Sequence, residues 1–192
     1  MIENIAVRLE KACVGIAGAG GLGSNAAIAL IRAGVQNIVI ADYDNVEKSN
    51  LNRQYFFADQ IGMSKVEALK INALRINSDC NIAAHHLKVT PENAVALFSG
   101  CDVIIEAFDN AAQKIMLIET LMEQLPHVPL VVGSGMGGWG RSNEIQCKQL
   151  ENIVLCGDFE TESNELHPPL APRVGIVANM QANEALRLLL AE

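Results

Sequence analysis

The chain has 192 residues, half of them hydrophobic, with 22 acidic against 14 basic side chains and a formal net charge of -8. This length suits one domain, or one domain with an appendage, and is enough for a sizeable core. Neutralising nucleic-acid phosphates needs a basic face, so the acidic balance argues against general nucleic-acid binding. No apolar run reaches the length of a membrane span, and charged residues interrupt the N-terminal apolar residues. We therefore expect a soluble, cytoplasmic protein without membrane association.

Short apolar runs alternate along the chain with longer runs in which apolar residues recur at helical spacing. The apolar runs predict buried strands at residues 13–17, 38–41, 82–87, 103–105 and 130–132. The periodic runs predict helices at residues 25–31, 65–77, 91–98, 111–125 and 174–190. Gly34 is a plausible stop for the first helix, and Thr90 a plausible cap for the third. Alternating strands and helices predict an α/β fold with a Rossmann-like, mostly parallel sheet and helices on both faces.

The last third of the chain is less regular. Residues 133–140 are glycine-dense and predict a loop, and residues 143–149 predict a strand. The acidic stretch 157–165 is a candidate mobile loop that leads into the final helix. We expect a single domain over the whole chain, with a Rossmann-like core at residues 1–135 and a C-terminal strand and helix extension at residues 136–192.

The five cysteines are widely scattered, and no two of them form a CxxC pair. An odd, scattered set argues against a secreted disulfide framework and against a zinc ribbon, so no structural zinc is expected. Cys13 and Cys101 lie in or beside apolar runs and are expected to be buried, inert thiols. Cys147 and Cys156 lie in the irregular part of the chain, and their role stays open.

A glycine-rich turn connects the first predicted strand to the first predicted helix. Its glycines are Gly18, Gly20, Gly21 and Gly23. Glycine at these places allows a tight turn, a close approach of the backbone to phosphate and close packing of helix on strand. Asp42 follows about twenty residues later, at the end of the second strand, where a carboxylate can accept both ribose hydroxyls. These residues predict a nucleotide site, and a dinucleotide dehydrogenase fits them equally well.

Polar residues after two of the predicted strands favour a triphosphate. Asn50 and Arg53 lie in the loop after Asp42, and Lys65 begins the next helix. Two cations and an amide suit a triphosphate, which carries more charge than a dinucleotide's pyrophosphate. Asp109 follows strand 103–105, whose carboxyl end should open on the same crevice. A carboxylate beside phosphates is a natural Mg²⁺ ligand, although Asp109 also stands where it can cap the following helix.

Several of these segments carry a resemblance to a known family. The stretches GAGGLGS, DYDNVEKSNLNRQ, IGMSKVEAL and EAFDNAAQK resemble the ordered signature of the ubiquitin-activating-enzyme superfamily, in particular the ThiF and MoeB adenylyltransferases. The resemblance covers about residues 12–135, with a weaker match at residues 181–185, and SNLNRQ is its most diagnostic part. Within the family, the chain is most similar to compact ThiF-like proteins of thiamine biosynthesis.

The resemblance implies ATP- and Mg²⁺-dependent adenylation of the C-terminal Gly-Gly carboxylate of a small ubiquitin-fold sulfur carrier, with release of pyrophosphate. By motif, the nucleotide-binding residues are Gly18, Gly20, Gly21, Gly23, Asp42, Asn50, Arg53, Lys65, Asp109 and Asn110. The implied catalytic residues are Arg53 and Lys65, which meet phosphate charge, and Asp109, which holds Mg²⁺. These roles agree with in-line phosphoryl chemistry, which depends on positioning and charge stabilisation. The C-terminal extension would face the carrier.

The chain departs from the family pattern in three places. The zinc-binding pair of CxxC motifs is missing, so packing must hold the C-terminal lobe. An N-terminal arm that lends an arginine across the dimer in relatives is absent, and Arg8 stands at the wrong spacing to replace it. Lys114 stands where the family usually has an arginine. We nevertheless expect a homodimer.

Other functions remain open. Dehydration of a modified tRNA base occurs in the same superfamily, but the negative net charge disfavours it. A nucleotide-binding partner or scaffold without turnover is compatible with the missing arm and with Lys114. A NAD-dependent dehydrogenase would give no reason for Arg53, Lys65 and Asp109 to converge.

Three further residues have open roles. Some ThiF-like relatives link a cysteine in this later region covalently to the carrier, but acidic neighbours of Cys156 would raise the pKa of its thiol and disfavour that role. Trp139 would either line a groove for the carrier's tail or plug the sheet. Asp44 is expected to stabilise its loop rather than bind a ligand.

Overall fold

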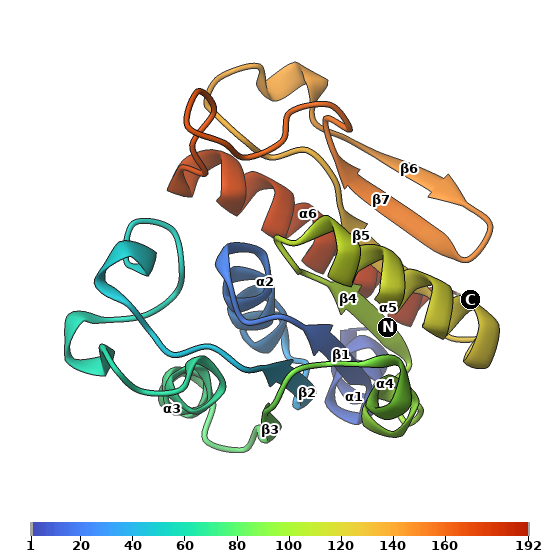
Figure 1. Ribbon diagram of the computed structural model, residues 1–192. Coiled ribbons are helices and arrows are strands. Elements are labelled where there is room, and N and C mark those ends of the chain that lie inside the picture. The colour runs from blue at the N-terminus through green and yellow to red at the C-terminus, as the bar shows by residue number, and fades with distance from the viewer. Residues whose placement is uncertain (1, 192) are drawn as a thin grey trace.

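The computed structural model describes residues 2–191, and in them one sheet of seven strands runs through the molecule (Figure 1). The strands are β1 (Cys13–Ala17), β2 (Asn37–Asp42), β3 (Asn81–His86), β4 (Val103–Glu106), β5 (Leu130–Gly133), β6 (Gln146–Leu150) and β7 (Ile153–Gly157). Their order across the sheet is β3-β2-β1-β4-β5-β7-β6. Neighbouring strands are parallel, except that β6 and β7 form an antiparallel pair at one edge.

Helices cover both faces of this sheet. They are α1 (Ile2–Lys11), α2 (Gly21–Ala33), α3 (Lys65–Ile76), α4 (Pro91–Phe98), α5 (Ala111–Gln124) and α6 (Ala171–Leu190). Helices α2, α3 and α6 share one apolar cluster with the sheet, and α4 and α5 share a second. The predicted α/β fold with a mostly parallel sheet and helices on both faces is confirmed. No helix in residues 2–191 is long and apolar enough to cross a membrane.

The central strands read as continuous apolar runs because both of their faces are buried. In neighbouring strands, Ile16 and Ile105 join the first cluster, whereas Ala17 and Ile104 join the second. Successive strand residues point to opposite faces, so each strand supplies both clusters at once. This explains why the sequence showed runs rather than alternation at these positions.

The predicted strands and helices are confirmed, with small shifts in their bounds, up to β5. Helix α2 ends at Gly34 in the left-handed conformation, with a φ of 110°, as expected of a glycine stop. It begins at Gly21, however, four residues before the predicted start, so the glycine turn itself forms the first helical turn. The predicted strand 143–149 is wrong at its start, because Ser142–Glu144 is a short 3-10 turn and β6 begins at Gln146.

Two elements were not predicted from the sequence. Helix α1 packs near the C-terminal end of α6. There the Arg8 guanidinium donates to the carbonyl oxygens of Leu189 and Ala191 at 2.9 and 2.8 Å. Strand β7 pairs in parallel with β5 and carries β6 beside it. Residues 136–191 thus contribute two strands to the same sheet, and α6 lies alongside α2 (Figure 1).

A buried ion pair joins the C-terminal loops to α6. The Arg173 guanidinium lies 2.6 Å from Asp158 Oδ2, and the two side chains are only 3% and 2% exposed. The same carboxylate accepts hydrogen bonds from the N–H groups of Glu160 and Thr161 and from the Thr161 hydroxyl. Burial alone would raise the pKa of Asp158, but these hydrogen bonds and Arg173 together hold that pKa well below its usual range.

Asp158→Asn should destabilise the protein by about 3–5 kcal/mol at neutral pH, because it leaves Arg173 as a buried, uncompensated charge. The wild-type carboxylate has a lower pKa when folded than when unfolded. Its contribution is therefore fully present above the unfolded pKa of about 4 and is lost as the pH falls from there through the lower folded pKa, so the stabilities of the two proteins should approach each other progressively below about pH 4. Urea unfolding at several pH values measures this difference.

The matched control is Glu144→Gln, which breaks the exposed ion pair between Arg141 and Glu144. That substitution should change the stability little, since exposed pairs are screened by solvent. A loss of stability in Glu144→Gln as large as that in Asp158→Asn would contradict the role given to the buried ion pair between Arg173 and Asp158.

Candidate nucleotide-binding site

A pocket of about 330 Å³ opens at the carboxyl ends of the central strands. It lies where β1 and β4 are neighbours, which is the point at which the chain reverses its direction of progress across the sheet. Open parallel sheets bind ligands at such a switch point. Predicted site residues line the pocket: Gly18, Gly20, Gly21, Asp42, Arg53, Lys65 and Asp109. Gly23, Asn50 and Asn110 do not line it.

The glycine turn brings α2 into close contact with β1. Gly18 has a φ of 102°, and a Cβ at Gly23 would lie 1.8 Å from the carbonyl oxygen of Gly18. Glycine is therefore required at both positions, at Gly18 by the backbone conformation and at Gly23 by the lack of space. A Cβ on Gly20 would have its nearest neighbour 3.9 Å away, so glycine there leaves space at the N-terminus of α2. A helix N-terminus with free N–H groups and an open approach is suited to a phosphate.

Asp42 lies at the end of β2 with 9% of its surface exposed. Its Oδ2 accepts a hydrogen bond from Ala19 N–H at 2.6 Å, and its Oδ1 accepts one from Asp44 N–H at 2.8 Å. Burial raises the pKa of Asp42, and these two N–H groups oppose the rise. Each carboxylate oxygen can accept a second hydrogen bond. Asp42 therefore orders the glycine turn and can still accept hydroxyl groups from a ligand.

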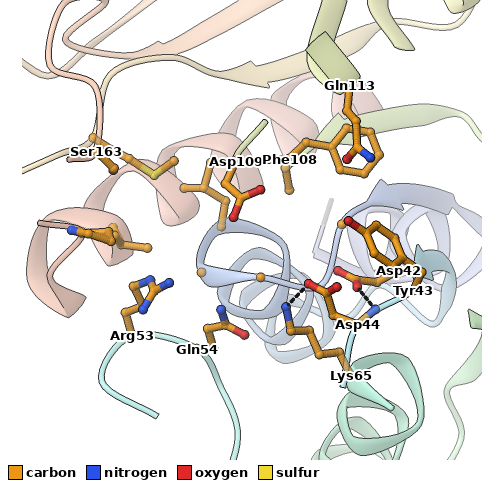
Figure 2. A pocket seen from close by; sticks show the side chains of 18 of the residues that line it. Asp42, Tyr43, Asp44, Arg53, Gln54, Lys65, Phe108, Asp109, Gln113 and Ser163 are labelled. Carbon is orange, nitrogen blue, oxygen red and sulfur yellow. Dashed lines mark hydrogen bonds and ion pairs between the residues drawn. The ribbon is translucent and has the colours of Figure 1, made fainter. Parts of the chain in front are cut away.

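Lys65 begins α3 and lies at the base of the pocket. Its Nζ is 2.7 Å from Asp44 Oδ2, with the lysine side chain 8% exposed and that of Asp44 47% exposed (Figure 2). Asp44 was expected to stabilise its loop, and this ion pair, with the backbone bond from Lys65 N–H to Asp44, ties the loop to α3. A bound anion would share Lys65 with Asp44.

Arg53 reaches the pocket from the loop after β2. Its Nη1 donates to Ser49 O at 3.2 Å and to Asn52 Oδ1 at 2.8 Å. Within residues 2–191 no carboxylate lies within ion-pair distance of Arg53. Its charge is therefore available to a ligand, in contrast to that of Lys65.

The structure distinguishes Asp109, which lines the pocket, from Asn110, which caps the following helix. Asp109 is exposed and lines the pocket, on the side across from Lys65 (Figure 2). Asn110 is the N-cap of α5, and its Oδ1 accepts a hydrogen bond from Gln113 N–H at 3.0 Å. The alternative in which Asp109 caps this helix is therefore wrong. Asn50 likewise supports the backbone, because its Oδ1 accepts from Glu47 N–H at 3.0 Å.

The donor chemistry at Asp109 suits Mg²⁺, which prefers carboxylate, phosphate and water oxygens. In the described part of the chain, no three His, Cys, Asp or Glu side chains cluster closely enough to hold a metal ion by themselves. A magnesium ion at Asp109 would therefore need ligand phosphates and water to complete its coordination.

Several pocket residues were missed by the sequence analysis. Gln54 is 8% exposed, and in residues 2–191 its Oε1 has no hydrogen-bond partner. A buried amide oxygen of this kind is available to a ligand donor. Gln54 directly follows Arg53 in the diagnostic motif, which was a usable signal. Other missed residues approach the pocket only through the tertiary fold. Gln113 comes from α5, and several come from loops: Tyr43, Leu87, Val89, Phe108, Met136, Ser163, Asn164 and Pro169.

Lys114 and Arg8 do not line the pocket. Lys114 forms an ion pair with Glu106, which is fully buried, and donates to Gly133 O at 2.9 Å. Burial raises the pKa of Glu106, and the nearby Lys114 opposes that rise. Arg8 contacts the C-terminal end of α6, whereas Val174 near the opposite end of that helix lines the pocket. Arg8 therefore stabilises the fold, and Lys114 connects the carboxyl ends of β4 and β5.

The cysteines and Trp139 also lie outside the pocket lining. Cys156 is fully buried, and that burial, followed by the nearby Cys147, raises the pKa of its thiol. The direction agrees with the prediction, but the main cause is burial, and the acidic residue that adds to the rise is Glu184 of α6 rather than one next to Cys156 in the sequence. Cys101 is buried as expected, whereas Cys13 is half-buried. Trp139 is 67% exposed, so it is not a plug over the sheet.

Comparisons with known proteins agree with this architecture. The sequence matches the ThiF family over residues 2–192, and the chain therefore belongs to that family. It is 32% identical over 198 aligned positions to the adenylyltransferase and sulfurtransferase MOCS3 of Anopheles gambiae, covering 96% of this chain and 43% of that protein. The Aedes aegypti protein of the same name is 30% identical with the same coverage. The chain thus spans less than half the length of these relatives.

Two solved structures from E. coli share the fold. The tRNA N6-threonylcarbamoyladenosine dehydratase TcdA in complex with AMP superimposes with a TM-score of 0.89 at 23% identity, covering 98% of this chain and 90% of that one. MccB with ATP superimposes with a TM-score of 0.75 at 21% identity, covering 96% of this chain and 57% of that one. At these identities the similarity establishes the fold alone.

Asn110→Ala should destabilise the protein by about 1 kcal/mol, because the first turn of α5 loses its side-chain cap. Asp109→Ala should leave the stability nearly unchanged, since the Asp109 carboxylate is exposed and does not cap the helix. Thermal and urea unfolding of the two variants, without nucleotide, compares them directly. Equal losses for both would contradict the division of roles between these neighbours.

Proposed function

We propose that this protein adenylates the C-terminal Gly-Gly carboxylate of a small ubiquitin-fold sulfur carrier of the ThiS type, in cytoplasmic thiamine biosynthesis. The observation that carries the proposal is the convergence of Arg53, Lys65 and Asp109 on the glycine turn, from three different loops and helix ends. A dinucleotide site needs the glycine turn and Asp42 but gives no reason for these three charged groups. A triphosphate with a metal ion needs all of them.

Each part of the pocket has a place in this proposal. The turn at Gly20 and Gly21 and the N-terminus of α2 would hold phosphate, and Asp42 would accept the ribose hydroxyls. Arg53 and Lys65 would neutralise phosphate charge. Asp109 would hold Mg²⁺, which supplies further charge neutralisation when bound. Apolar residues of the wall would accept the base: Ala41, Leu87, Val89 and Phe108.

The proposed reaction needs no nucleophile from the protein. A carboxylate oxygen of the carrier attacks the α-phosphorus of ATP, the bond from that phosphorus to the bridging oxygen breaks, and its electron pair leaves with pyrophosphate. Negative charge shifts onto the leaving group during this step. Cations that are already in place around the phosphates stabilise such charge, which is the role given to Arg53 and Lys65.

The relatives support the substrate class. MOCS3 is named an adenylyltransferase and sulfurtransferase, and MccB has been solved with ATP and with an analogue together with MccA. The chain spans less than half of MOCS3, so we limit the proposal to adenylation and propose nothing about sulfur transfer. Because TcdA is a tRNA-modifying enzyme with the same fold, a tRNA is the second candidate substrate.

The rim of the pocket favours a protein over a tRNA. The loop after β7 contributes Ser163 and Asn164 to the pocket wall and presents Leu166, which is 79% exposed, close to the pocket. Three exposed side chains of this loop are acidic, Glu160, Glu162 and Glu165, and the exposed residue that follows Leu166 is His167. An acidic rim repels a polyanion, whereas exposed Leu166 and Trp139 offer apolar contacts to a protein surface.

Arg53→Ala and Lys65→Ala should each lower carrier-dependent pyrophosphate–ATP exchange on the order of a hundredfold, because each removes a group that meets developing charge. The fold should survive in both, which circular dichroism checks. Arg187→Ala, which removes the half-exposed Arg187 from its ion pair with Glu184 on α6 and does not touch the pocket lining, is the control and should keep full exchange. Near wild-type exchange in either pocket variant would show that its assigned role is wrong.

Asp109→Asn should keep the fold but raise the Mg²⁺ concentration needed for exchange, because the amide lacks the anionic oxygen that a hard cation prefers. A Mg²⁺ titration of exchange in the two proteins measures this. Unchanged Mg²⁺ dependence in the variant would mean that Asp109 is not a ligand. Exchange stimulated by tRNA and not by any carrier would favour the second candidate.

A further inference from the structure

Two of the five cysteines face each other across the antiparallel hairpin at the edge of the sheet, where β6 lies beside β7 (Figure 1). Cys147 of β6 is the register partner of Cys156 of β7, and their Sγ atoms lie 3.5 Å apart. Both are free thiols, with Cys147 exposed and Cys156 fully buried. Neither lines the nucleotide pocket, so the proposed adenylation gives this pair no role.

The backbone of the hairpin holds the two cysteines at a separation that suits a disulfide. Directly opposed residues of an antiparallel pair have Cα atoms about 4.5 or 5.5 Å apart, depending on whether the pair is hydrogen-bonded. Both separations lie within the range of about 4.4–6.8 Å that disulfides span. Opposed side chains also lie on the same face of the sheet. The two sulfur atoms can therefore reach bonding distance by side-chain rotation, with little movement of either strand.

Strand β6 has few attachments to the rest of the protein. All five of its residues are exposed, and in the described residues β7 is its only neighbour in the sheet. Apart from the pairing with β7, Gln149 Oε1 accepts a hydrogen bond from Arg187 of α6 at 3.0 Å. A strand with so little buried surface is expected to open locally from the sheet. A covalent bond to β7 would oppose that opening.

We propose that Cys147 and Cys156 are a redox-sensitive thiol pair, which a small-molecule disulfide such as oxidised glutathione converts reversibly into a cross-strand disulfide that fastens β6 to β7. In a reducing compartment the pair stays as two thiols until the proportion of small-molecule disulfide rises. The proposal does not rest on the adenylation function, because its test involves neither nucleotide nor carrier.

The exposed thiol reacts first. The Cys147 thiolate attacks one sulfur of the glutathione disulfide, whose S–S bond breaks, and one glutathione thiolate leaves. The Cys156 thiol then loses its proton and attacks Cys147 Sγ, which displaces the second glutathione thiolate. The two leaving thiolates take up the two protons that the cysteines released. Two protein thiols are thus oxidised to a disulfide, and one glutathione disulfide is reduced to two thiols.

The rate of this exchange should depend on pH. Burial raises the pKa of both thiols. From α6, Glu184 adds to the rise and Arg187 opposes it. Since the thiolate is the attacking species, oxidation should be slow at neutral pH and about tenfold faster for each pH unit below the pKa of the thiol.

A second pair of cysteines provides an internal comparison. The sulfur atoms of Cys13 and Cys101 lie 3.8 Å apart. These two residues are not register partners, since Asp102 N–H donates to Cys13 O at 2.8 Å. Cys13 is half-buried and Cys101 is buried, so this pair lacks an exposed thiol at which the exchange can begin. We therefore expect Cys147 and Cys156 to be oxidised in preference to it.

Incubation of the full chain with increasing ratios of oxidised to reduced glutathione tests the proposal, with acid quenching and alkylation of free thiols in denaturant. The reduced protein should be alkylated at five cysteines and the oxidised protein at three, with Cys147 and Cys156 recovered as one cross-linked peptide by mass spectrometry. Excess reduced glutathione should return all five thiols. Hydrogen exchange at the amides of β6 should be about tenfold or more slower in the oxidised protein, because the cross-link opposes local opening.

The control is Cys13→Ser, which should still form the disulfide, whereas Cys147→Ser should not. Circular dichroism checks that both variants are folded. A wild-type protein that keeps five free thiols in oxidised glutathione alone would overturn the proposal. So would a Cys147 that stays linked to glutathione, a cross-link between Cys13 and Cys101 that leaves Cys147 and Cys156 free, or equal exchange rates of β6 in the two forms.

Discussion

The close contact between the first turn of α2 and the end of β1 is the constraint on which the site depends. With Gly23 packed against the carbonyl group of Gly18, no side chain fits between helix and strand, and the helix N-terminus opens directly over the sheet. Asp42 fixes the same turn from the neighbouring strand through Ala19 N–H. The position of this helix N-terminus, where we propose that a phosphate binds, follows from this contact.

A second, buried polar layer lies beneath the pocket and binds the C-terminal helix to the sheet. Gln181 of α6 is fully buried and donates to Glu106 O at 2.8 Å and to Val131 O at 3.3 Å. Glu106 in turn pairs with Lys114, which contacts Gly133. Buried polar groups need partners, so these contacts specify where α6 sits. Together with the Arg173 and Asp158 pair, they hold the C-terminal part of the chain against the sheet.

Local patterns in the sequence were enough for the parts of the protein that depend on local chemistry. The sequence predicted that the glycine turn, Asp42, Arg53, Lys65 and Asp109 lie near one another, because each belongs to a segment that connects a strand to the next helix, and strand ends of a parallel sheet share an edge. The structure places them around one pocket. The roles of Asn50 and Asn110 were harder to assign, since an amide beside a phosphate motif and an amide that caps a helix look alike in sequence. The long-range contacts of Arg8, Lys114 and Gln181 could not be read from spacing at all.

We propose that the pocket is built for a triphosphate with a metal ion and not for a dinucleotide. The thermal midpoint of the wild-type protein, measured with ATP and Mg²⁺ and then with NAD at the same concentration, tests it most directly, because a ligand that binds only the native state raises the stability by RT ln(1 + [L]/Kd). A clear rise with ATP and Mg²⁺ and none with NAD is the expected result. An equal rise with NAD would contradict the claim.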